Sequence, residues 1–139
     1  MSAPAETTAL PDIYLSAEDY QLLDHLLGDS SSQGVAGLLR REIDRAKVVP
    51  GASLPRDAVG LYRWAHYVEG DGPTAGARRV RLVLPLEADI DKGAVSVLSH
   101  VGAGLLGLRE GQTIDWPDPS GRTRRLTPVL VEDPETPAA

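Results

Sequence analysis

The chain has 139 residues, 42% of them hydrophobic and 24% charged, with a net charge of −6, as expected of a soluble globular protein with one ordinary domain or two very small ones. The absence of cysteine excludes disulfides, thiolate metal sites and cysteine nucleophiles. No apolar run is long enough to span a membrane, and the N-terminus lacks a signal-peptide pattern, so we expect a cytoplasmic protein that makes no contact with membranes.

The N-terminal part of the chain is predicted to form a helical hairpin. Residues 1–15 are expected to be a disordered arm, because the first eleven are rich in Ala, Pro and Thr. Ser16 with Asp19 three residues later is a weak capping box, and apolar residues then recur at helical spacing as far as Leu27. A second amphipathic helix is expected over residues 33–47, so residues 16–48 should form an antiparallel hairpin with a short polar turn.

The net charge is confined to this N-terminal third. Residues 1–39 contain six acidic residues and no Lys or Arg, whereas residues 40–139 contain fourteen acidic and fourteen basic residues. The acidic third is either a solubilising face or a prong that is attracted to a basic surface.

Periodicity changes after Pro50 from helical spacing to alternation. Residues 49–56 read as a linker, residues 57–132 as a second domain, and residues 133–139 as a disordered tail. Within the second domain, strand-like segments alternate and one short helix is expected near residues 101–108. The predicted fold class is therefore α+β, a short N-terminal antiparallel helical hairpin followed by an antiparallel sheet with one short helix on one face.

Few residues suggest chemistry on their own. The three histidines have no metal-ligand spacing, and we expect no catalytic residue, metal or cofactor. Gly102, Gly104 and Gly107 spell G-x-G-x-x-G, but a dinucleotide site needs a longer helix in a βαβ unit, so we interpret these glycines as packing residues. Trp64 is either exposed as a contact residue or covered by the hairpin or the linker.

Two basic tracts raise the possibility of a nucleic-acid site. Arg78, Arg79 and Arg81 form the first, and the second consists of Arg122, Arg124 and Arg125. Few aromatic residues lie among them and the chain is acidic overall, so we interpret them as solvated strand faces and expect no sequence-specific binding of nucleic acid.

One stretch resembles a known family. The run from Ser96 to Trp116, SVLSHVGAGLLGLREGQTIDW, is similar to the C-terminal domain of the bacterial GreA/GreB transcript-cleavage factors, and more so to their short Rnk-like relatives, the regulators of nucleoside diphosphate kinase. The resemblance implies an FKBP-like second domain that grips RNA polymerase at the rim of its secondary channel. In the Gre factors a long hairpin enters the channel, and acidic residues at its tip hold the metal that drives RNA cleavage.

The resemblance also implies which residues would act. The family loop that touches polymerase matches Leu98, Ser99 and His100, with Val101 and Gly102 at the start of the helix. Independently of the resemblance, Trp64 is the next candidate for a contact, because an exposed tryptophan often marks a contact surface.

The hairpin tip offers Asp24 and Asp29, which are too few carboxylates for a hard divalent ion. The resemblance therefore implies a non-enzymatic regulator that binds RNA polymerase and competes with Gre factors. The alternatives are a true transcript-cleavage factor, an FKBP-like interaction module or a peptidyl-prolyl isomerase, and the oligomeric state stays open.

Overall fold

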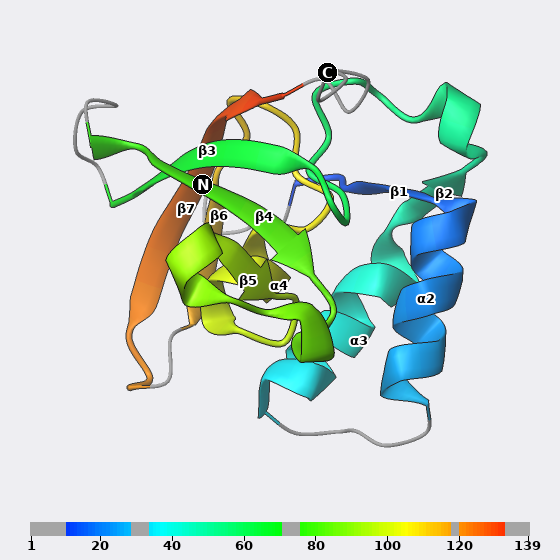
Figure 1. Ribbon diagram of the computed structural model, residues 1–139, viewed down its shortest axis with the longest axis horizontal. Helices are drawn as coiled ribbons and strands as arrows, with labels where there is room; N and C mark the ends of the chain where they lie inside the picture. Colours follow the sequence, from blue (N-terminus) through cyan, green and yellow to red (C-terminus); the bar gives the residue numbers. More distant parts are fainter. Residues whose placement is uncertain (1–10, 29–33, 71–75, 118–119, 133–139) are drawn as a thin grey trace, which may run out of the picture.

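The computed structural model describes residues 11–28, 34–70, 76–117 and 120–132, arranged as a helical hairpin beside a curled sheet (Figure 1). The N-terminal elements are β1 (Tyr14–Ser16), α2 (Ala17–Leu27), α3 (Gly34–Arg45), β2 (Lys47–Val49) and the 3-10 turn η1 (Gly51–Ser53). The C-terminal elements are β3 (Trp64–Glu69), β4 (Arg78–Val83), η3 (Pro85–Glu87), η4 (Ile90–Lys92), β5 (Ala94–Ser96), α4 (His100–Leu105), β6 (Ile114–Pro117) and β7 (Thr123–Val131). Among the described residues, no helix is long and apolar enough to cross a membrane.

Helix α2 begins and ends where the sequence predicts. The Ser16 side chain accepts a hydrogen bond from the Asp19 N–H at 3.0 Å, which satisfies one of the free donors at the start of the helix. Gly28 follows Leu27 with a φ of 54° and ends the helix. Helix α3 is slightly shorter than predicted and packs beside α2 (Figure 1).

The expected disordered arm over residues 1–15 is wrong at its C-terminal end. Ile13 and Leu15 are fully buried in the core, and β1 pairs in parallel with β2. A strand of three residues is too short to show alternation in the sequence. The sequence also does not indicate which segment would pair with it. The predicted linker over residues 49–56 likewise includes the end of β2 and the turn η1. Asp29 and the expected tail over residues 133–139 lie outside the described residues.

The large sheet has the strand order β5-β4-β3-β7-β6 and is mixed rather than wholly antiparallel. Strands β3, β4, β6 and β7 pair antiparallel, as predicted, but β5 runs parallel to β4. The chain between β4 and β5 passes through η3 and η4 and returns to the middle of β4, where Ala94 at the start of β5 pairs with Arg81, so the two strands run in the same direction.

Strand β3 has an irregular start and an irregular centre. It begins at Trp64, because Tyr62, two residues earlier, adopts a φ of 66°, outside the range of a strand. A register shift between His66 and Tyr67 then places both Tyr67 and Val68 in buried positions.

A single hydrophobic core joins the hairpin to the sheet. One cluster contains Leu23 and Ile43 of the helices together with Leu82 and Ile114 of the sheet. At the joint, the Leu61 N–H donates to the Asp19 Oδ2 at 3.0 Å, and burial raises the pKa of this carboxyl group. The two predicted domains therefore form one packed unit.

Helix α4 lies close on the sheet because its glycines carry no side chain. A Cβ at Gly104 would lie 2.6 Å from Leu126 Cδ1 and 2.9 Å from Trp116 Cγ, which is closer than side chains approach. This contact confirms the interpretation of the glycine pattern as a packing feature.

Candidate partner-binding site

The loop between β5 and α4 has a fixed shape. The Ser99 hydroxyl accepts a hydrogen bond from the Gly102 N–H at 3.0 Å and donates to the Ser96 carbonyl at 2.6 Å. The Leu98 N–H also donates to the Ser96 Oγ at 2.9 Å. Ser99 is therefore the N-cap of α4, and its hydroxyl is occupied inside the loop rather than offered to a partner.

The predicted contact residues differ in what a partner can reach. Leu98, Ser99, His100 and Val101 are each half-buried, so part of each side chain is accessible. Gly102 is buried, and a Cβ there would lie 2.2 Å from the Ser96 carbonyl oxygen. Gly102 therefore shapes the loop, and any direct contact falls to its neighbours.

A groove of about 400 Å³ opens beside this loop. Ser99, His100 and Val101 line it together with Ile90, Val95 and Arg78. The His100 Nε2 atom is buried and has no hydrogen-bond partner within the described part of the chain. The predicted loop thus forms one wall of a depression that sequence reasoning did not foresee.

Trp64 is covered by arginines, which neither sequence alternative anticipated. The Arg79 Cζ lies 3.9 Å from the ring centroid and the Arg81 Cζ 5.3 Å, so both cations stack near the indole. A Cβ at Gly93 would lie 3.1 Å from Trp64 Cζ3, which places the ring against Gly93, one of the groove residues. Trp64 is half-buried and adjoins the groove without lining it.

Arg79 is also held by an ion pair. Its Nε lies 2.6 Å from the Glu132 Oε2, and the His66 Nε2 lies 2.7 Å from the same oxygen. Hydrogen bonds from Arg79 and then from His66 lower the pKa of Glu132 to about 2. The Arg79 guanidinium is therefore already paired with the Glu132 carboxylate of the same chain.

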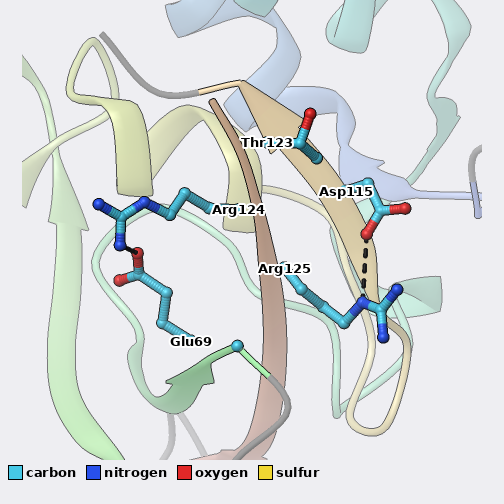
Figure 2. A pocket seen from close by; sticks show the side chains of 6 residues that line it. Glu69, Asp115, Thr123, Arg124 and Arg125 are labelled. Carbon is cyan, nitrogen blue, oxygen red and sulfur yellow. Dashed lines mark hydrogen bonds and ion pairs between the residues drawn. The ribbon is translucent and has the colours of Figure 1, made fainter. Parts of the chain in front are cut away.

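Two arginines of the second basic tract, Arg124 and Arg125, also form ion pairs (Figure 2). Arg124 lies 2.8 Å from a Glu69 oxygen, and Arg125 lies 3.2 Å from an Asp115 oxygen. The two arginine side chains leave β7 on opposite sides and line an open, polar hollow of about 350 Å³ with Thr123 (Figure 2). These ion pairs favour the interpretation of the arginines as solvated strand residues over that of a nucleic-acid site.

The hairpin acid Asp24 is also engaged. The Arg40 Nη1 lies 2.9 Å from the Asp24 Oδ1, and the Arg40 Nη2 donates to the Gly28 carbonyl at 3.2 Å, which caps the end of α2. Within the described residues, no group of three or more His, Cys, Asp or Glu side chains could hold a metal ion. Asp24 is thus neutralised by a cation from the neighbouring helix.

The aromatic residues do not gather around the groove as an isomerase pocket would require. Trp116 and Tyr67 are buried in the core, and Tyr67 is the aromatic residue that reaches the groove lining. The isomerase alternative therefore gains no support from the described site.

Comparison with known proteins gave matches over most of the chain. Residues 54–133 match a family model described as transcription elongation factor, GreA/GreB, C-term, and residues 11–49 match the Rnk N-terminus. The regulator of nucleoside diphosphate kinase of Escherichia coli (strain K12) is 33% identical over 125 residues, covering 88% of this chain and 90% of that protein. Transcription elongation factor GreA of Xylella fastidiosa (strain M12) is 32% identical over 132 residues, covering 95% and 80% respectively.

A solved structure supports the same assignment. The prokaryotic transcription elongation factor GreA/GreB from Nitrosomonas europaea matches with a TM-score of 0.68 and 31% sequence identity. The match covers 87% of this chain and 98% of that chain. Both the hairpin and the curled sheet thus have counterparts in this structure.

Proposed function

This chain belongs to the GreA/GreB transcription elongation factor family, with an N-terminus of the Rnk type, and we propose that it regulates transcription by binding RNA polymerase without cleaving RNA. In this proposal the loop before the small helix makes the contact, at the rim of the secondary channel. At that site the chain competes with Gre factors.

The observation that carries this proposal is the preformed loop over residues 98–101. The Ser99 hydrogen bonds hold it in one shape, and a groove adjoins it on the surface. A loop that is already ordered loses little conformational entropy when a partner binds, so more of the contact energy appears as affinity.

Two features of the hairpin favour a regulator over a cleavage factor. Helices α2 and α3 have 11 and 12 residues, and such helices are only about 17–18 Å long at 1.5 Å per residue. Asp24 is bound to Arg40, so its carboxylate is not free to share a hard metal ion. A short hairpin whose described acid, Asp24, is already paired supports binding without chemistry.

Replacing His100 with glutamate is expected to weaken binding to RNA polymerase by about tenfold or more, because it puts a negative charge in the middle of the contact. Binding of the labelled protein to RNA polymerase from its native host, followed by fluorescence anisotropy, measures the effect. His25→Glu is the matched control, since His25 is an exposed histidine on α2. Equal binding by His100→Glu and wild type, with both folded by circular dichroism, would place the contact elsewhere.

Adding the protein to backtracked RNA polymerase with Mg²⁺ is expected to leave the RNA cleavage rate at its intrinsic value. Added together with GreA, it should lower the stimulated rate, because both proteins occupy the same rim. Gel analysis of the shortened RNA measures both effects. A stimulation that disappears in Asp29→Ala would identify the chain as a cleavage factor after all.

A further inference from the structure

Ile90 is the most unusual residue of the groove, because this large apolar residue is 85% exposed. It is held in a fixed position. The Asp89 Oδ1 accepts from the Asp91 N–H at 3.1 Å, and the backbones of Asp89 and Ala94 exchange hydrogen bonds of 2.8 and 3.0 Å. Ile90 therefore projects from a turn that is held by hydrogen bonds. Val95 and Val101 are apolar residues in the same groove lining.

The groove also contains a cation without an acidic partner. Arg78 lines it and contacts the Tyr67 side chain, but no acidic residue of the described ranges forms an ion pair with Arg78. The next arginine, Arg79, is by contrast matched by Glu132. The groove thus combines an apolar wall with a single unmatched positive charge, and a carboxylate on a partner would complement that charge.

We propose that this groove receives a large apolar side chain of RNA polymerase that lies next to a carboxylate on the same segment. The apolar side chain packs on Ile90 and Val101, which removes exposed apolar surface from water. The carboxylate pairs with Arg78. This inference rests on the proposed function and adds the chemistry of the polymerase segment that the site selects.

The apolar half is tested by a pair of exposed residues on one loop. Ile90→Ser is expected to weaken polymerase binding by about tenfold. Leu86→Ser is the matched control, because Leu86 is even more exposed than Ile90, on the neighbouring turn η3, but does not line the groove, and it should change affinity less than about twofold. Both side chains project into solvent, so neither variant removes a core contact.

The proposed ion pair with a carboxylate is tested by reversing the charge at Arg78. Arg78→Glu is expected to weaken binding by about tenfold at low salt, with a smaller loss at high salt, because salt screens exposed charges. Arg41→Glu on α3 makes the same change of charge on an exposed residue outside the groove. Equal effects of Arg78→Glu and Arg41→Glu would overturn the pairing with a carboxylate.

The outcomes separate the two proposals. If the wild-type protein does not bind polymerase, the proposed function fails and the groove assignment fails with it. If the wild type binds and Ile90→Ser binds equally well, the groove assignment alone is overturned. Analytical ultracentrifugation adds one further outcome: a dimer that dissociates in Ile90→Ser would assign the groove to a second copy of this chain and overturn the polymerase segment.

Discussion

Replacing Arg45 with methionine is expected to lower the free energy of unfolding by about 3–5 kcal/mol, the usual cost of removing one partner from a buried ion pair. The Glu42 side chain is only 5% exposed, and the Arg45 guanidinium donates to both of its oxygens at 2.7 and 3.1 Å. The same guanidinium donates to the Pro11 carbonyl at 2.6 Å. Without Arg45, a buried carboxylate and the N-terminal segment both lose their partner.

Urea denaturation followed by tryptophan fluorescence measures this loss. The double variant with Met at both Glu42 and Arg45 should recover most of the stability, because two apolar side chains of similar size replace the whole pair. Arg41→Met, about one helical turn before Arg45 and exposed, should change stability by less than about 0.5 kcal/mol. An Arg45→Met protein as stable as wild type would show that Glu42 finds solvent or another donor.

Replacing Gly102 with alanine is expected to cost about 3 kcal/mol, at the upper end of typical overpacking. The new Cβ would lie 2.2 Å from the Ser96 carbonyl oxygen and 3.0 Å from the Ser96 carbonyl carbon, and these backbone atoms cannot rotate aside. The substitution must therefore displace the end of β5 or the first turn of α4. The same displacement disturbs the Ser99 cap, so polymerase binding should fall together with stability.

Whether Gly102→Ala lowers or raises the stability distinguishes two explanations. Helix propensity alone predicts that alanine stabilises a helix over glycine by about 1 kcal/mol. Thermal melting thus separates the two explanations, because only the steric clash gives a lower melting temperature. Gly76→Ala is the control, since a Cβ there meets nothing within 4 Å and Gly76 lacks a positive φ. A Gly102→Ala protein that melts at or above the wild-type temperature would contradict the close approach.

The sequence was sufficient for elements with a local signal. Ser16 marks the start of α2, because an N-cap acts through its own neighbours in the sequence. Family membership was also predictable, since the run from Ser96 to Trp116 carries the resemblance that the family match confirms.

Features that depend on distant residues were not predictable. The parallel entry of β5 beside β4 depends on the path through η3 and η4, and a three-residue strand carries no sign of its direction. Strand β1 has the same difficulty, because Leu15 is buried by residues far along the chain. A hydrophobic pattern shows that a residue is apolar, whereas its partners are set by the tertiary fold.

The candidate site was likewise predictable from the sequence only in part. The loop at Ser99 was found through its resemblance to a family, but the pattern did not distinguish a contact residue from the cap of α4. A serine directly before a helical segment was the available signal for the cap. Arg78 lies on β4 and Ile90 in the turn η4, and neither position carries a sequence signal that links it to the loop, so only the fold shows that both line the groove.

The shared core limits how the length of the helical hairpin can change. Because Leu23 and Ile43 pack into the same cluster as the sheet residues, the roots of both helices are fixed and the hairpin cannot pivot as a separate arm. The hairpin can be lengthened only by adding residues at the end away from the sheet, between Gly28 and Gly34. Each full turn added to both helices would extend it by about 5.4 Å. A lineage or a designer could therefore lengthen the hairpin step by step without repacking the body of the protein.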